Sequence, residues 1–136
     1  AITSVAGATL EYSFDGINWS STPPGSLPDG NYTIKVRQTV AGETSTATDF
    51  TFSYDATAPD KLTIELTNDT GSDATDHITT DNSTTIGNQE NGAVIEYSID
   101  NGVTWTSTAP ANLVAGDYTI LARQVDLAGN ASDPAP

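Results

Sequence analysis

Apolar and polar residues alternate with a period of two along most of this chain. In the first clear example, Leu10, Tyr12 and Phe14 are separated by single polar residues. This alternation predicts a β-strand that buries one face and exposes the other. The same pattern recurs at residues 32–37, 50–54, 62–67 and 94–99. Since no stretch shows helical periodicity, we expect an all-β fold.

An internal repeat organises these predicted strands into two copies. Residues 7–15 read GATLEYSFD and match residues 92–100, which read GAVIEYSID, and a tryptophan follows each segment. Residues 27–38 then match residues 113–124. The period of about 85 residues suits one β-sandwich module and is too long for one coil of a solenoid.

A tyrosine recurs at the start of a predicted strand in both copies. The pattern Leu-x-x-Gly-x-Tyr ends at Tyr32 and again at Tyr118. It resembles the tyrosine corner of Ig-like sandwiches, in which the phenol bonds to backbone a few residues upstream. The alternative is an ordinary buried tyrosine, and the two matched occurrences favour the corner. The predicted architecture is therefore a tandem of Ig-like β-sandwich modules.

The repeat places a domain boundary at a short proline-containing stretch, residues 55–59. We expect a first module at residues 1–57 and a second at residues 58–136. The first copy lacks a segment matching residues 61–83, and the second lacks a strand matching residues 50–54. Two interpretations fit these gaps. The chain is a fragment or contains a shortened domain, or a strand from a neighbouring chain completes each half-module.

The composition narrows the classes of function. The chain has 4 Lys+Arg against 18 Asp+Glu, for a formal charge of −14, and it has no cysteine. So acidic a chain argues against binding nucleic acid through its phosphates, and the missing cysteines exclude disulfides and cysteine metal sites. No apolar run is long enough to span a bilayer, so we expect no membrane insertion. An acidic chain suits divalent cations or a strongly solvated surface.

The ordered series of motifs resembles a known family. Tyr-Ser-x-Asp, a tryptophan, Leu-x-x-Gly-x-Tyr-Thr-Ile, Arg-Gln and Ala-Gly-Asn-x-Ser follow one another in the second copy, and Asp-Ala-Thr-Ala-Pro stands at the junction. This series is similar to the bacterial Ig-like (Big) tandem repeats of giant, type I-secreted cell-surface adhesins of the RTX/Bap type. The resemblance implies a long array of Ig-like sandwiches at the cell surface, with calcium at or near the domain junctions.

An acidic loop in the second copy is the best candidate metal site. Asp69, Asp73 and Asp76 are spaced by four and three residues, and a glycine between them allows a tight bend. Calcium takes six to eight oxygen ligands, which the carboxylates and carbonyls of such a loop could supply. Asp55 in the linker and Asp126 beside the Ala-Gly-Asn motif could join from adjacent loops. The alternative is a solvated acidic loop, and the resemblance favours calcium.

Neither a sugar-binding platform nor a catalytic centre is favoured by the remaining motifs. Trp19 and Trp105 follow equivalent hairpin turns and could stack on a sugar ring, but their repetition favours a packing role. The single histidine, His77, lies in the acidic loop. Because neither a cysteine nucleophile nor a nucleophile-elbow motif is present, we expect no enzymatic activity.

The sequence favours a structural function. We expect an extender segment of a bacterial adhesin, secreted or displayed at the cell surface, in contact with neighbouring Ig-like repeats and stiffened by calcium. Short linkers and carboxylate–ion bridges would limit bending between the modules. A self-assembling fibre subunit, joined by β-strand complementation between neighbouring chains, is the first alternative. The second is a calcium-dependent adhesin module that binds a sugar or peptide as its host or surface ligand.

Overall fold

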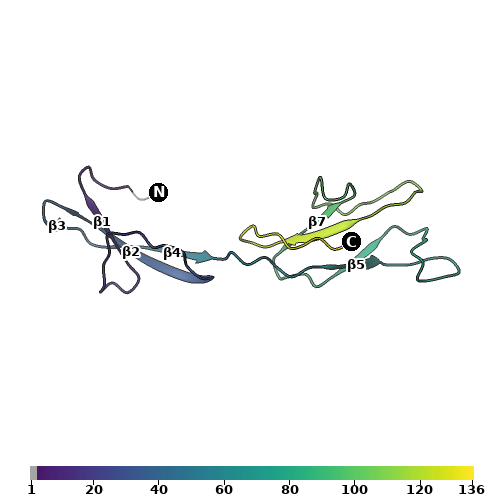
Figure 1. Ribbon diagram of the computed structural model, residues 1–136, viewed down its shortest axis with the longest axis horizontal. Helices are drawn as coiled ribbons and strands as arrows, with labels where there is room; N and C mark the ends of the chain where they lie inside the picture. The colour runs from purple at the N-terminus through teal and green to yellow at the C-terminus, as the bar shows by residue number, and fades with distance from the viewer. Residues whose placement is uncertain (1–2) are drawn as a thin grey trace. The chain divides into compact units, whose positions relative to one another are not determined.

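The computed structural model describes residues 3–136, and within them the chain forms eight strands and no helix. The predicted all-β character is therefore confirmed, and among these residues no helix could cross a lipid bilayer. The chain divides into two compact units, Ala1–Ala56 (unit 1) and Thr57–Pro136 (unit 2) (Figure 1). The strands, in chain order, are β1 (Thr9–Ser13), β2 (Gly30–Val40), β3 (Glu43–Thr44), β4 (Thr48–Tyr54), β5 (Thr63–Leu66), β6 (Thr84–Gly87), β7 (Val94–Ser98) and β8 (Leu121–Val125).

Unit 1 is built around the long strand β2. In the described part of this unit, β1, β3 and β4 all pair with β2 in antiparallel fashion and form one four-stranded sheet. Figure 1 shows β1, β2 and β4 side by side. The register places Tyr12 opposite Val36, and Ile34 opposite Phe50. Because residues paired across strands point to the same side of a sheet, the apolar residues of all three strands gather on one face.

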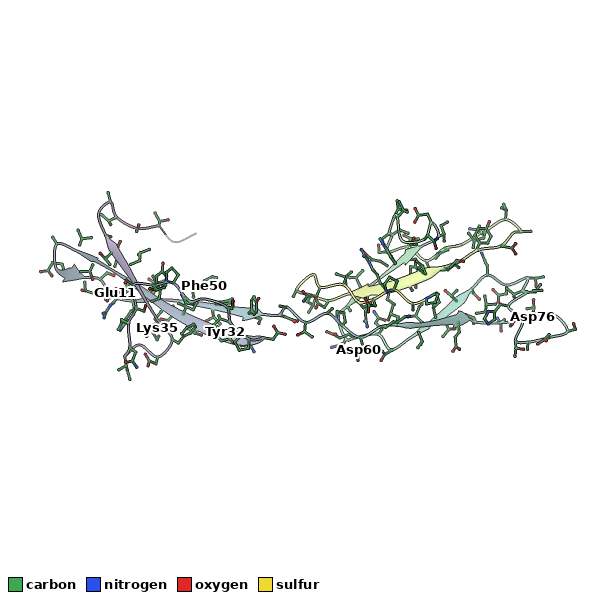
Figure 2. All side chains as sticks on the ribbon, viewed as in Figure 1. Glu11, Tyr32, Lys35, Phe50, Asp60 and Asp76 are labelled. Atoms are coloured by element: carbon green, nitrogen blue, oxygen red, sulfur yellow. The ribbon has the colours of Figure 1, made fainter. Side chains whose placement is uncertain are left out.

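This apolar side of the unit 1 sheet, which we call the open face, lacks a second layer within the described residues. It comprises Leu10, Tyr12, Phe14, Tyr32, Ile34, Val36, Phe50 and Phe52. Its aromatic rings form a row, with centroid distances of 6.1 Å for Phe14–Tyr32, 5.8 Å for Tyr32–Phe52 and 5.5 Å for Phe50–Phe52. Phe50 remains 61% exposed, and Figure 2 labels both Phe50 and Tyr32 on this sheet.

The opposite face of the unit 1 sheet carries polar pairs that join neighbouring strands. Lys35 Nζ lies 2.8 Å from Asp49 Oδ2, and the hydroxyls of Thr33 and Thr51 are 2.9 Å apart. Lys35 is labelled on this sheet in Figure 2. Such cross-strand pairs stabilise a solvated face only modestly, so the apolar side is where unit 1 has most to gain from burial.

Unit 2 buries a small hydrophobic core between two antiparallel pairs of strands. Within its described residues β5 pairs with β6, and β7 pairs with β8. Leu62, Tyr97, Ala122 and Ala135 form the core, with Tyr97 only 8% exposed. The partly buried residues packed against it are Ile64, Ile86, Ile95 and Ile120. Both strand pairs therefore contribute side chains to the same hydrophobic cluster.

The two units differ in how much of the repeated strand is paired. Strand β2 begins at Gly30, whereas the matching β8 begins only at Leu121, although Gly116 is the residue that matches Gly30. In unit 1, β4 supplies the partner for residues 30–36 of β2. In the described part of unit 2 that edge is met only by isolated bridges, such as the one from Ala122 to Ala135. Among the described residues, positions 116–120 therefore have no strand partner, and the strand predicted to start at Tyr118 begins only at Leu121.

Candidate functional site

A Ser-x-Asp turn follows the first repeated strand of each unit. In unit 2, Ser98 Oγ donates to Asp100 Oδ1 (2.7 Å), and Asp100 also accepts from the Thr104 backbone N–H (2.9 Å) and hydroxyl (2.6 Å). Asn101 and Gly102 adopt positive φ angles of 63° and 82°, which an Asn-Gly turn accepts at little cost. These hydrogen bonds, led by that of the Thr104 side chain, lower the pKa of the Asp100 carboxyl to about 2.

Unit 1 repeats this turn with its own aspartate. Asp15 Oδ1 accepts from Ser13 Oγ (2.9 Å) and from the backbone N–H groups of Ile17 and Asn18 (both 2.8 Å). Several hydrogen bonds hold the pKa of the Asp15 carboxyl well below its ordinary value, and the bond from the Asn18 backbone N–H has the largest effect. Hydrogen bonds to a carboxylate stabilise its charged form, so both aspartates fasten turns.

The tryptophan at the matched position of each repeat copy is covered on one side by an arginine. The Arg37 guanidinium carbon lies 3.9 Å from the centroid of the Trp19 ring, and that of Arg123 lies 4.2 Å from the Trp105 ring. Each arginine forms an ion pair with a glutamate. Arg37 Nε lies 2.9 Å from Glu11 Oε2, and Arg123 Nη2 lies 2.7 Å from Glu96 Oε2. This stack uses a ring face of each indole inside the chain, which favours the packing role over a sugar platform.

The tyrosine-corner hydrogen bond is present in both units. Tyr32 Oη donates to the carbonyl of Pro28 over 2.6 Å, and Tyr118 Oη donates to the carbonyl of Val114 over 3.0 Å. Both bonds reach back four residues along the chain, as the motif predicts. The predicted phenol-to-backbone contact is thus confirmed at both positions.

A buried glutamine that was not predicted from the sequence joins distant segments of unit 2 through hydrogen bonds. Gln124 is 0% exposed, and its Nε2 donates to the carbonyls of Asp60 (2.6 Å) and Asn88 (3.1 Å). Its Oε1 accepts from the Glu90 backbone N–H over 2.7 Å. The repeated Arg-Gln pair was the sequence signal for this position, but the partners of the amide lie far away along the chain.

The acidic loop between β5 and β6 uses its carboxylates to hold its own backbone. Asp69 Oδ2 accepts from the His77 backbone N–H (3.0 Å). Asp73 Oδ1 accepts from the Thr75 backbone N–H (3.0 Å), and Asp76 Oδ1 accepts from that of Ile78 (2.9 Å). Figure 2 labels Asp76 in this loop. One oxygen stands apart, because Asp69 Oδ1 is enclosed and accepts no hydrogen bond from the described residues.

Asp126 caps a different loop and is 8% exposed. Its Oδ1 accepts the backbone N–H groups of Ala128 (2.9 Å), Gly129 (2.7 Å) and Asn130 (2.8 Å), and its Oδ2 accepts from Asn130 Nδ2 (2.8 Å). These hydrogen bonds, the Asn130 side chain first, lower the pKa of the Asp126 carboxyl. Asp55, the remaining predicted ligand, follows β4 in unit 1 and is exposed.

The predicted calcium ligands lie on three segments: the loop between β5 and β6, the turn after β8 and the residue after β4. Across residues 3–136, no three carboxylate or histidine side chains gather closely enough to hold a metal ion. Asp126 already accepts four hydrogen bonds, and calcium needs six to eight oxygens around one point. Of the predicted set, only Asp69 offers an enclosed oxygen that lacks a donor in the described chain.

A groove of about 760 Å³ lies over the open face of unit 1. It is lined by open-face residues from all three long strands, and Gln38, Arg37 and Pro24 border it. This groove was not predicted from the sequence. The signal that could have located it was the absence, in the first copy, of a match to residues 61–83, since in unit 2 that stretch includes β5.

Comparison with known proteins adds no assignment. No family model matches the chain, and no curated protein matches it. The interpretation of both units therefore rests on their own geometry and on the internal repeat.

Proposed function

We propose that this chain is a structural extender, a pair of tandem Ig-like sandwich modules from a bacterial cell-surface adhesin. The observation that carries the proposal is the duplication of the same fastenings in both units. The tyrosine–carbonyl bond, the Ser-x-Asp turn and the Glu–Arg–Trp stack recur at matched positions. These groups satisfy one another within each unit, which suits a repeated spacer rather than a repeated ligand site.

The linker supports this role, because hydrogen bonds fasten the chain on both sides of it. On the unit 1 side, the Ala56 backbone N–H donates to Asp29 Oδ1 over 2.9 Å. On the unit 2 side, the Asp60 carbonyl accepts from Gln124 over 2.6 Å. Residues 57–59 lie between these two hydrogen bonds, and they end in the buried Pro59. A short segment with a fixed proline φ angle has little freedom to bend.

The Ig-like sandwich is the architecture that best accounts for these observations. In unit 2, Leu62 and Ile64 from the β5 region join Tyr97 of β7 and Ala122 of β8 in one core. Two antiparallel layers around a shared core are the arrangement of a β-sandwich. The tyrosine-corner hydrogen bonds of Tyr32 and Tyr118 give the proposal its second support.

Calcium stiffening stays a prediction, and Asp69 is its best remaining candidate. A cation that binds only the folded chain raises the melting temperature. We expect a rise at millimolar calcium that Asp69→Asn abolishes, while Asp133→Asn, which removes the same charge at an exposed position, leaves it unchanged. Equal melting temperatures with calcium and with a chelator would contradict the prediction and leave the linker as the stiffening element.

Pulling on single molecules tests the extender function directly. A tether must resist force, and unfolding of unit 2 would lengthen the chain by roughly 3.3–3.6 Å per released residue. We expect discrete rupture events with that increment. Featureless extension would contradict the proposal. So would saturable binding of a sugar or peptide, or filaments in electron micrographs, each of which supports one of the alternative functions.

A further inference from the structure

The internal repeat identifies what the open face of unit 1 corresponds to in unit 2. In the repeat alignment Leu10, Tyr12, Ile34 and Val36 match Ile95, Tyr97, Ile120 and Ala122. All four matched residues of unit 2 belong to, or pack against, its hydrophobic core. There the covering residues are Leu62 and Ile64 with Ile86, from the segment that contains β5 and β6. The open face of unit 1 is thus the same surface without its cover.

The glutamine at the end of the repeated strand gives independent evidence. Gln38 and Gln124 make two equivalent hydrogen bonds, each in its own unit. Gln38 Oε1 accepts from the Val5 backbone N–H (3.0 Å), and Gln124 Oε1 accepts from that of Glu90, the residue that matches Val5 (2.7 Å). Each also donates its backbone N–H to a matched serine over 3.1 Å. In unit 2 the amide nitrogen goes further and donates to the carbonyl of Asp60. Asp60 directly precedes residues 61–83, the segment that has no match in unit 1.

The groove in unit 1 therefore combines an apolar floor with a polar group at its border. The floor consists of open-face residues, and Gln38 borders the same groove of about 760 Å³. A strand with alternating aliphatic residues would fill the floor. A backbone carbonyl just ahead of that strand would accept from the Gln38 amide, as the Asp60 carbonyl does from Gln124.

We propose that the open face of unit 1 is a docking surface for a strand pair of the β5–β6 kind. The occupant is a further copy of the segment at residues 57–89, with aliphatic side chains in the pattern Leu-x-Ile-x-Leu. The copy within this chain is not available, because Leu62 and Ile64 are already part of the unit 2 core. Moving it to unit 1 would uncover Tyr97 and Ala122 and gain no net burial.

A chimera tests the proposal in the context of the whole chain. Glu90 matches Val5, so residues 57–89 placed directly ahead of Val5 would enter unit 1 in the register of unit 2. Amide hydrogen exchange is then measured in β1, β2 and β4. We expect exchange in β2 to slow by about tenfold or more when the open face is covered, because buried, packed strands open less often.

The control chimera carries Leu62→Asp and Ile64→Asp in the added segment only, which keeps its length but removes its apolar face. It should leave exchange in unit 1 at the rate of the unmodified chain. Gln38→Ala in the first chimera should remove part of the added protection against exchange, since the added Asp60 carbonyl loses its donor. Equal exchange in the two chimeras would overturn the proposal.

A second measurement guards against another occupant. If light scattering shows that the unmodified chain forms a stable dimer in which open-face amides become protected, two unit 1 sheets pair with each other and the assignment is overturned. A monomer whose open face exchanges freely supports it. The inference rests on the repeat rather than on the extender function. A chimera that gains protection in a chain without mechanical resistance would separate the two.

Discussion

At the scale of single residues, the aspartates of this chain act mainly as acceptors for nearby backbone. Asp100 and Asp15 close matched turns, and Asp126 holds three successive N–H groups of its own loop. A carboxylate used in this way is charged in the folded state and stabilises the turn through that charge. Much of the acidity that suggested cation binding thus has a local structural use.

Acid should weaken both units through these turns. The folded pKa of Asp100 is about 2, below its ordinary value of 3.8. A lowered pKa means that the contribution of the carboxylate is fully present above about pH 4 and is lost as the pH falls towards 2. Urea unfolding followed between pH 7 and 2 should show this loss, and Asp100→Asn should reduce it in unit 2. An unchanged pH profile in the variant would contradict the assignment.

The tyrosine corners should each stabilise their own unit. Tyr32→Phe and Tyr118→Phe remove one hydrogen bond each, at an expected cost of about 0.5–1.5 kcal/mol in the free energy of unfolding. Tyr54→Phe is the matched control, because the Tyr54 hydroxyl makes no hydrogen bond to residues 3–136 and the side chain is 41% exposed. Losses equal to that of the control would show that the corner bonds add no stability.

At the scale of elements, the two copies of the repeated strand sit in different surroundings. Strand β2 has its edges paired with β1 and β4 but leaves its apolar face open, whereas β8 lies in the core of unit 2 with an incompletely paired edge. The same local sequence thus meets different neighbours, and stability should follow the neighbours.

The matched glutamines provide that comparison within one molecule. Gln124→Ala leaves the Asp60 and Asn88 carbonyls and the Glu90 N–H without their partner, so unit 2 should lose about 2–4 kcal/mol. Gln38→Ala should cost unit 1 about 1 kcal/mol, because fewer groups depend on it. Residue-resolved urea titration by NMR separates the units, since a chain of two units need not unfold in one step. Equal losses would contradict this account.

Particular residues explain what the sequence could and could not predict. The strands β1, β2, β4, β5 and β7 and the hydrogen bonds of Tyr32 and Tyr118 are local, so alternation and a six-residue motif were enough to predict them. The strand expected to start at Tyr118 begins only at Leu121, because pairing depends on a partner strand elsewhere in the chain. The hydrogen bonds of Asp126 could not be predicted, because the spacing of carboxylates along the sequence does not reveal which backbone N–H groups they accept. Gln124 was missed because its partner Asp60 is 64 residues away. Such long-range bonds depend on the packed fold, which no local pattern encodes.

At the scale of the whole molecule, the chain is best understood as two copies of one module joined by a short, fastened linker. Each unit has its own internal bonds, and the linker adds an anchor to each of them. An extender works only if such a linker keeps the distance between its modules within a narrow range. The central claim is therefore about the linker at residues 57–59.

The distance distribution between spin labels in the two units tests that claim most directly. The chain has no cysteine, so Ile17→Cys and Leu127→Cys, at positions 81% and 89% exposed, can be labelled selectively. Pulsed dipolar spectroscopy should give one narrow distribution, and a Gly-Ser insertion after Thr57 should broaden it. A distribution that is already as broad in the unmodified chain as in the insertion variant would contradict the extender account.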